Sequence, residues 1–429
     1  MYDVASYVLE ALKKAGADKA SVNVAKNKKD EFNIEANKFT LMRTLFNDSL
    51  FMKALVGGRK GTITINKLDK DSIDEAVAGC IALAKSGNPD EAEDIAPLEE
   101  NKVFDQSAGG ADLDKLFSRT KEYLEKVNAD FPKIMLDGVT TDFNSGEWVH
   151  LNTNGVDFSG KQEYYGFSSS FLAKDGENSS SFNYDGARLR DLNTSFMNTG
   201  IHRQLLEESV KSLNTRMVDE KFTGKVIFTP TCADIWYTIL SCFLSEGALI
   251  EDTSIWKNLL GIVVADPRIT FSSNCSNPKL VWGETVTADG FLSRDFDYIK
   301  NGVLSSFALS LYGANKTGKP RAANTSMWSF EVAPGDVSLS EMIKGVDKGI
   351  LLNRFSGASP GPGGDMSGVA KNSFLIENGE ITDALQETML SFNAAEVLKN
   401  LVSISKEQIC DGGSVLPWCC FDGITVSGK

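Results

Sequence analysis

Residues 20–68 read ASVNVAKNKKDEFNIEANKFTLMRTLFNDSLFMKALVGGRKGTITINKL, and this stretch decides the fold class. Apolar and polar residues alternate within SVNVAK, DEFNIEAN, SLFMKALV and GTITINKL, and Asn, Asp and Gly separate the alternating runs. A period of two with turn residues at its boundaries is typical of half-buried antiparallel strands. The stretch therefore predicts an antiparallel sheet with one face on the core.

Helical periodicity brackets this predicted sheet. Residues 3–16 place their apolar side chains on one helical face, and residues 71–86 return to helical spacing after the last strand. The same order then recurs, with a helix over 111–131, strand-like segments between 133 and 189, and a helix over about 200–217. Helices that alternate with antiparallel strands in this way indicate an α+β fold.

The rest of the chain is predicted to be rich in strands. A strand over 225–230 precedes a helix, 235–246, that is apolar nearly all round and should be buried. A second capping-box pattern runs from Ser338 to Glu341, after a first one at Thr231. Asn-Gly pairs, which favour two-residue hairpins, occur at 154–155, 301–302 and 378–379.

These patterns divide the chain into three predicted parts. Residues 1–105 form an N-terminal α/β subdomain, residues 106–222 a second helix and strand subdomain, and residues 223–429 a β-rich C-terminal domain with a few helices. The acidic, aperiodic segment 87–111 is predicted to connect the first two parts.

Composition excludes several classes of protein. The chain has 429 residues, with 58 acidic and 44 basic side chains and a net charge of −14. A duplex-binding protein usually has a basic stripe, so direct contact with nucleic acid is disfavoured. The N-terminus lacks an apolar signal region, and the longest apolar stretch, 235–244, is about half of what a bilayer requires. We expect a cytoplasmic protein that does not contact a membrane.

Few residues are available for neutral-pH acid-base or metal chemistry. The only histidines are His150, in a run of alternating strand residues, and His202, in the first turn of a predicted helix. We predict His150 to be a satisfied or exposed strand residue rather than a metal ligand, and His202 to lie at the surface. The seven cysteines are sparse and never spaced as C-x-x-C, so a disulfide framework and a structural zinc site are both disfavoured.

Two local features could still carry a site. Cys410 precedes Asp411 and two glycines in a predicted loop, where it could be reactive or act as a soft ligand. The glycine-rich stretch 356–368, SGASPGPGGDMSG, could bring backbone amides close to an anion or a peptide, or could be only an irregular turn. Adjacent Cys419 and Cys420 predict one buried and one exposed thiol on a strand. No hydrolase, phosphate-loop or zincin motif is present, so the residues alone indicate no catalytic centre.

A set of ordered stretches connects the C-terminal half to a known family. They are DPRITF (266–271), DGFLSRDFDYIKNGVLSSFALSLYGANKTG (289–318), SFEVAPGDVSLSEMIKGVDKGILLNRFSG (329–357), GGDMSGVAKNSFLIENGEIT (363–382) and ITVSGK (424–429). In order and spacing this half resembles the TldD/PmbA family, whose PmbA branch is also called TldE. The N-terminal half is similar more loosely, through its opening helix and GGRKGTITINKL (57–68).

The resemblance implies a dimer around an inner cavity and, in the TldD branch, zinc-dependent cleavage of unfolded peptides. That branch carries His-Glu-x-x-x-His on the first helix of the C-terminal unit, and a later cysteine completes the zinc ligands. The equivalent helix here, IWYTILSCFLSEG (235–247), contains no histidine, and Glu246 is its only acid. Cys410 falls near the position of the ligand cysteine, as a residual ligand position at most.

This departure places the chain in the PmbA/TldE branch. The branch implies a non-catalytic subunit that pairs with a TldD-type catalytic subunit, with zinc expected only in that partner. We therefore carry over no metal ligand and no catalytic residue. Gly363, Gly364, Asp365 and Ser367 are predicted to line a channel for unfolded peptide, and the isolated chain could form a homodimer.

Two alternatives stay open at this point. The chain could be a self-sufficient hydrolase with an unrecognised site at Cys410, which would be active alone and inactive as Cys410→Ala. It could also be a non-enzymatic regulatory binding protein, in keeping with the older family label of modulator of DNA gyrase; the charge of −14 argues against direct contact with DNA.

Overall fold

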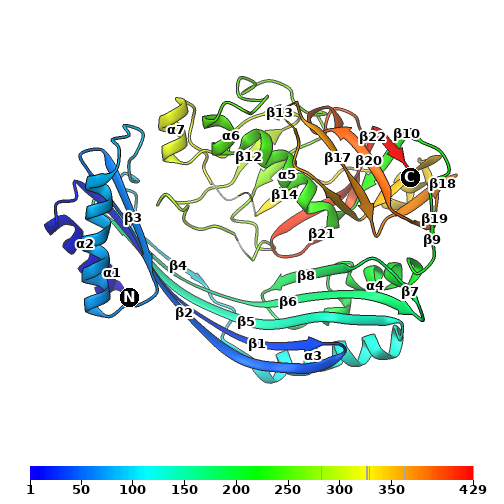
Figure 1. Ribbon diagram of the computed structural model, residues 1–429, viewed down its shortest axis with the longest axis horizontal. Coiled ribbons are helices and arrows are strands. Elements are labelled where there is room, and N and C mark those ends of the chain that lie inside the picture. The colour runs from blue at the N-terminus through cyan, green and yellow to red at the C-terminus, as the bar shows by residue number, and fades with distance from the viewer. Residues whose placement is uncertain (282, 325–326, 328, 362, 429) are drawn as a thin grey trace.

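Two sheet-based units build the molecule. The structure, a computed structural model, describes residues 1–281, 283–324, 327, 329–361 and 363–428. A long N-terminal sheet curves beneath a C-terminal unit rich in short strands (Figure 1). This mixture of helices with mainly antiparallel sheets confirms the predicted α+β class.

The N-terminal sheet has eight strands in the order β3-β2-β1-β5-β6-β4, with β7 and β8 also paired to β6. All pairs are antiparallel except β4 with β6. The strands are β1 (Lys19–Glu35), β2 (Lys38–Val56), β3 (Arg59–Ile65), β4 (Lys102–Gln106), β5 (Ile134–Asn152), β6 (Asp157–Asp175), β7 (Asn178–Ser179) and β8 (Asn183–Leu189). Strands from both of the predicted N-terminal parts thus pair in one sheet.

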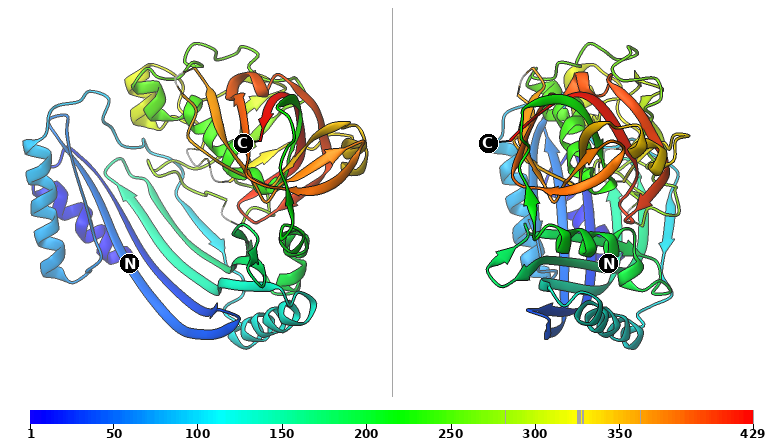
Figure 2. Two further views of the ribbon diagram at one scale, coloured as in Figure 1. Left: turned by 45° about the vertical axis from the view of Figure 1, so that its right-hand side comes forward. Right: turned by 90° about the vertical axis from the view of Figure 1, so that its right-hand side faces the viewer.

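One face of this sheet is apolar and carries the helices. On β1, Val22 and Val24 pack in one core cluster with α1 and α2, whereas Phe32 and Ile34 belong to a second cluster with α3 and α4. The helices are α1 (Tyr2–Lys14), α2 (Lys70–Ser86), α3 (Leu113–Asp130), the 3-10 turn η1 (Phe196–Asn198) and α4 (His202–Lys211). The alternate residues of the same strand, such as Asn23, point to the opposite, concave face, which the C-terminal unit overhangs (Figure 2).

The C-terminal unit contains a fourteen-stranded sheet that wraps around one helix. That helix, α5, buries Ile235, Trp236, Ile239, Leu240, Phe243 and Leu244, which confirms the prediction of a buried helix. The helix α5 spans Ala233–Leu244, and the other helices of this unit are η2 (Pro230–Cys232), α6 (Glu246–Ile250), α7 (Leu311–Thr317), α8 (Leu339–Lys344) and α9 (Ala394–Val397). The strands are β9 (Thr215–Arg216), β10 (Phe222–Phe228), β11 (Phe271–Ser273), β12 (Phe296–Lys300), β13 (Val303–Leu304), β14 (Phe330–Val332), β15 (Lys348–Leu352), β16 (Arg354–Gly357), β17 (Asp365–Lys371), β18 (Phe374–Glu377), β19 (Glu380–Leu385), β20 (Thr388–Asn393), β21 (Leu401–Cys410) and β22 (Ser414–Ser427).

Two of the three predicted two-residue hairpins are confirmed: the pairs at 301–302 and 378–379 join β12 to β13 and β18 to β19. The pair at 154–155 also lies in a hairpin, between β5 and β6, but the connection has four residues, 153–156, and of the pair only Gly155 has positive φ. Asn301 and Gly302 both have positive φ, as do Asn378 and Gly379, which is the conformation that two-residue hairpins require. The capping box at Ser338 is present as well.

Three local predictions were wrong. The segment 87–111 is more than a connector, because it contains β4, which pairs in parallel with β6. The helix expected over 200–217 ends at Lys211, where the Ser212 hydroxyl donates to the carbonyl of Glu208 and the chain turns toward β9. Thr231 does not cap α5, since its hydroxyl donates instead to the carbonyl of Asn353, at 2.7 Å.

Within the described residues, no helix is long and apolar enough to cross a bilayer. Pro362 of the glycine-rich stretch and Lys429 of the closing stretch lie outside the described residues.

Candidate functional site

A narrow cleft lies where α5 begins. It has a volume of about 180 Å³ and separates β8 of the N-terminal sheet from the C-terminal unit. We call it the Cys410 cleft; its walls are residues 184–187, 199–201, 230–234 and 409–414, with Arg354. The structure thus brings Cys410 to the start of the helix that resembles the family's ligand helix.

Structural contacts cross this cleft. The guanidinium of Arg354 lies 4.0 Å from the ring centroid of Tyr184 and donates to the carbonyl of Thr231 at 2.7 Å. It also donates to the carbonyl of Tyr184. The Tyr184 hydroxyl in turn donates to the carboxylate of Asp234, at 3.3 Å. A cation stacked on an aromatic ring therefore ties the two units together here.

The side chains of the cleft do not fit a zinc ion. Cys410 donates its thiol to the carbonyl of Lys279 at 3.4 Å, and burial raises its pKa, so the sulfur is a protonated thiol rather than a thiolate. Asp185 already contacts Nδ1 of His202 at 3.2 Å. Across the part of the chain that the structure describes, no three His, Cys, Asp or Glu side chains are grouped so that they could hold a metal ion. We therefore derive no metal chemistry for this chain.

The predicted channel residues lie at the other end of α5. Gly364 has a φ of +91°, and a Cβ atom there would lie 3.4 Å from the ring of Phe243. The side-chain amide of Asn393 donates to the carbonyl of Gly363 at 2.8 Å and to the carboxylate of Asp365 at 3.0 Å. Ser367 follows on β17, 3.2 Å from the hydroxyl of Ser391. The four residues therefore form one local turn and strand start, but the structure does not bring them to Cys410.

His202 is buried, so its predicted place at the surface was wrong. Its side chain has no exposed area, and Nε2 lies 2.9 Å from the hydroxyl of Tyr123. Both ring nitrogens have partners, because the carboxylate of Asp185 lies within hydrogen-bond distance of Nδ1. This histidine begins α4 on the covered face of the sheet, where the apolar ring edges of Phe167 and Phe171 surround it. The prediction of one exposed thiol at Cys419 and Cys420 was also wrong, since both side chains are buried.

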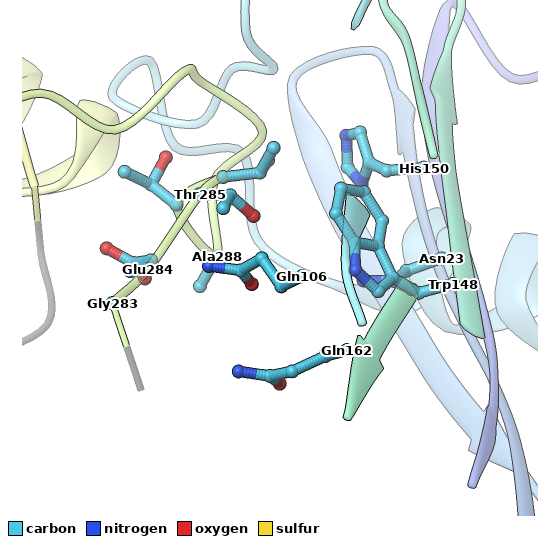
Figure 3. A pocket seen from close by; sticks show the side chains of 11 residues that line it. Asn23, Gln106, Trp148, His150, Gln162, Gly283, Glu284, Thr285 and Ala288 are labelled. Atoms are coloured by element: carbon cyan, nitrogen blue, oxygen red, sulfur yellow. The ribbon is translucent and has the colours of Figure 1, made fainter. Parts of the chain in front are cut away.

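A second space lies over the concave face, and no residue of α5 lines it. This space, which we call the Trp148 groove, has a volume of about 720 Å³. The sheet supplies Asn23, Gln106, Trp148, His150 and Gln162, and the loop 283–288 of the C-terminal unit forms the opposite wall (Figure 3). In Figure 3, Thr285 and Ala288 face Trp148, with Gln106 and Gln162 between the two walls.

His150 anchors the edge of this groove. It is only 7% exposed, and burial lowers its pKa to about 4 although the nearby carboxylate of Asp289 acts in the opposite direction. Its buried Nε2 atom has no hydrogen-bond partner among the described residues. A Cβ atom at Gly290 would lie 2.6 Å from this nitrogen, so the hairpin after the loop packs directly on the imidazole. The prediction of a satisfied or exposed strand histidine was wrong, because the ring is buried and its Nε2 has no partner among the described residues.

Several contacts fix the loop against the sheet. Arg321 makes two 3.1 Å contacts with Asp289 and lies 3.6 Å over the ring of Phe291. The amide of Leu292 donates to Glu99 at 3.0 Å. On the sheet side, the amide of Gln162 donates to the carbonyl of Val281 at 3.2 Å. The groove is therefore held open by both units.

Comparison with known proteins agrees with this architecture. Residues 222–428 match the family model described as the PmbA/TldA metallopeptidase C-terminal domain. The chain is 23% identical over 418 residues to a metalloprotease PmbA homolog of Haemophilus influenzae, covering 94% of this chain and 90% of that one. It is 22% identical to the metalloprotease PmbA of Escherichia coli O157:H7, covering 81% and 79%.

The C-terminal half belongs to the PmbA/TldD family. The fold agrees over the full length with TldE from Thermococcus kodakarensis, at a TM-score of 0.86, 18% identity and coverage of 99% and 100%. A proposed modulator of DNA gyrase from Bacteroides thetaiotaomicron superposes with a TM-score of 0.85, at 20% identity and coverage of 100% and 99%. These structural likenesses concern the fold of the family.

Sequence analysis missed the Trp148 groove. The alternation in EWVHLN does place Trp148 and His150 on one side of a strand, which is the signal that could have been used. The opposite wall comes from an irregular loop more than a hundred residues later, and no periodicity connects the two.

Proposed function

We propose that this chain is the non-catalytic subunit of a heteromeric TldD/TldE-type zinc metalloprotease that processes unfolded peptides. One observation carries the proposal: the ligand helix of the family, here α5, has no histidine and begins beside a protonated Cys410 in a cleft without a zinc-binding set. The full-length likeness in fold to an archaeal TldE supports assignment to the PmbA/TldE branch.

In this proposal the two subunits have different roles. A TldD-type partner holds zinc, while this chain shapes the path of the peptide and pairs with the partner in the cytoplasm. We assign Gly363, Gly364, Asp365 and Ser367 to the wall of that path, where an extended substrate can add to a sheet edge through main-chain hydrogen bonds. Without its partner the chain is expected to self-associate as a homodimer.

The decisive experiment is reconstitution. The chain is purified alone, its zinc content is measured by elemental analysis, and cleavage of a labelled unfolded peptide is followed. Both measurements are repeated after a TldD-type subunit has been added. We expect no stoichiometric zinc and no cleavage from the chain alone, and cleavage from the mixture.

A control variant makes the result specific. A TldD-type subunit whose zinc-ligand histidines are replaced should abolish cleavage by the mixture, whereas Cys410→Ala in this chain should leave cleavage intact. Activity of the isolated chain that disappears in Cys410→Ala would instead favour a self-sufficient hydrolase. A mixture that neither associates nor cleaves would leave a regulatory binding role as the better hypothesis.

A further inference from the structure

Strand β2 leaves part of its outer side without a neighbouring strand. Its register with β1 runs along the whole of β2, whereas β3 pairs with it only from Leu50 to Val56 (Figure 1). Among the described residues, no strand pairs with the outer side of residues 38–49, which we call the β2 edge. An unpaired edge presents a row of N–H and C=O groups to which another strand can hydrogen-bond.

The β2 edge is also exposed and apolar. Residues 38–47 are all exposed, and their large apolar members are Phe39, Leu41, Met42, Leu45 and Phe46. Met42 and Phe46 are the most exposed of these side chains, at 67% and 76%. Neighbouring residues on a strand point to opposite faces, so Leu45 and Phe46 make both faces of the edge apolar. Such an edge pairs with other chains unless something covers it.

The charges of the β2 edge do not oppose association. The edge carries two bases, Lys38 and Arg43, and one acid, Asp48, in a chain whose net charge is −14. Arg43 donates to the carboxylate of Glu31 on β1 at 2.6 Å, and the carboxylate of Asp48 lies 3.6 Å from the ammonium group of Lys26. Two acidic molecules repel each other over most of their surface, and this strand is a place where they do not.

An apolar groove adjoins the β2 edge where the strand lies beside α3. It has a volume of about 520 Å³, and its apolar walls are Phe32, Phe39, Leu41, Met42, Leu113 and Phe117. The ring of Phe117 lies 5.2 Å from that of Phe39 and 5.5 Å from that of Phe32, so aromatic rings form one side of it. A protruding aromatic side chain of a partner suits a groove of this kind.

The β2 edge is complementary to itself about Thr44. If two copies pair antiparallel about a two-fold axis through Thr44, Met42 of each copy lies opposite Phe46 of the other. The two most exposed apolar side chains then cover each other, and each Phe46 meets the groove beside Met42. An axis through Arg43 would place two arginines opposite each other, which is unfavourable. An axis one residue beyond Thr44 would place Met42 opposite Asp48.

From these observations we propose that the β2 edge is a homodimer interface, in which two copies of this chain pair antiparallel about Thr44 and join their N-terminal sheets into one. Each copy packs Phe46 at the apolar groove of the other. Two-fold pairing uses both free edges, so the assembly closes at two copies. The inference rests on the proposed function in one respect, the expectation that the isolated chain self-associates, and it names the surface responsible.

The first test measures the mass of the isolated chain by sedimentation equilibrium. We expect a dimer, and Phe46→Glu should raise the dissociation constant about a hundredfold or more, because two carboxylates enter an apolar interface. Val103→Glu is the matched control, since Val103 is 79% exposed on β4, at the opposite end of the same sheet, and it should leave the dimer unchanged. Circular dichroism checks that both variants are folded.

Cysteine crosslinking tests the register. Thr44→Cys should give a disulfide-linked dimer with copper phenanthroline in air, because directly opposed residues have Cα atoms about 4.5–5.5 Å apart, within the range of a disulfide. Met42→Cys should give none, because the two substituted positions lie four residues apart along the pair, or ~13 Å. The parent is oxidised in parallel to account for its seven cysteines.

The inference is overturned if the isolated chain is a monomer, if Phe46→Glu leaves the dimer intact, or if Met42→Cys crosslinks and Thr44→Cys does not. Failure of the proposed function looks different, because the chain would then dimerise through the β2 edge while the mixture with a TldD-type subunit fails to cleave. Cleavage by the mixture together with a dimer that Phe46→Glu does not dissociate would instead remove this interface and leave the proposed function.

Discussion

The Cys410 cleft and the Trp148 groove both lie between the N-terminal sheet and the C-terminal unit, yet their interiors are opposite in character. The cleft has about 180 Å³ and is crossed by Arg354, Tyr184 and Asp234, which bond to one another and to the backbone. The groove has about 720 Å³ and is lined by uncharged side chains apart from Glu284. Structural contacts fill the space at the start of α5, and the wider space lies over the concave face of the sheet.

The comparison teaches how two spaces between the same two units can contribute differently to the molecule. Arg354 and Asp234 both contact Tyr184, so the cleft contributes to the packing of the two units. The groove presents the carboxamides of Asn23, Gln106 and Gln162 to an open space, where a ligand can add hydrogen bonds. Stability should therefore depend on the cleft, and ligand binding on the groove.

The largest expected effect is a fall in the free energy of unfolding at acidic pH, and it tests whether His150 is a buried, neutral part of the groove wall. The unfolded chain binds a proton on this imidazole below pH 6.5, whereas the folded chain, with a pKa of about 4, does not. The free energy of unfolding is therefore fully maintained above pH 6.5 and falls as the pH drops from 6.5 to 4. The difference between the two pKa values corresponds to about 3 kcal/mol.

The measurement is urea unfolding of the parent and of His150→Gln at several pH values. Subtracting the two curves removes the contribution that the carboxylates make to the pH dependence. Among these carboxylates, burial raises the pKa of Glu208. The pKa of Glu31 is lowered to about 2 despite its burial, because Lys29, Asn33 and Arg43 hydrogen-bond to it. We expect the difference to depend on pH only below 6.5. Parallel curves across this window would show that His150 is accessible to protons and that the groove wall opens.

The next largest effect tests the cleft. Arg354→Ala removes the stacking on Tyr184 and leaves the carbonyls of Thr231 and Tyr184 without this donor. We expect the free energy of unfolding to fall by about 2 kcal/mol, as measured by the urea midpoint, because a cation–π contact and charged hydrogen bonds are lost together.

Arg354→Lys is the matched control, since it keeps the charge but not the planar fork of donors, and it should recover only part of the loss. If Arg354→Ala unfolds at the same urea midpoint as the parent, the structural role that the comparison assigns to the cleft fails.

The sequence predicts most of the elements on which these variants act. Period-two alternation in residues 20–68 and the Asn-Gly pairs are local signals, so the strands and hairpins follow from them. The burial of α5 follows from its apolar circumference for the same reason. The absence of histidine from this helix is visible in the sequence itself.

Contacts between distant segments could not be predicted in this way. The cleft depends on Arg354 reaching Tyr184, and the groove depends on loop 283–288 facing β5, and neither contact leaves a periodic signal. His202 shows the same limit, because a polar residue in the first turn of a helix predicts exposure unless Tyr123 and Asp185 are known to meet it. Burial of a polar side chain is decided by partners that are far away in the sequence.

The smallest expected effect is the sharpest test of the comparison. Cys410→Ser replaces a protonated thiol that contacts only the carbonyl of Lys279 and the amide of Gly412 among its recorded hydrogen bonds, both at 3.4 Å. A serine hydroxyl can make the same two contacts, so the free energy of unfolding should change by less than about 1 kcal/mol. Cleavage by the mixture with a TldD-type subunit should be unchanged, since burial raises the pKa of this thiol and a protonated sulfur is a poor nucleophile.

Cys275→Ser is the matched control, because Cys275 is also half-buried and its pKa is raised to about 12, by burial first and by its hydrogen bond to Asp295. If Cys410→Ser abolishes cleavage while Cys275→Ser does not, the cleft takes part in the chemistry, and the division between a structural cleft and a binding groove fails.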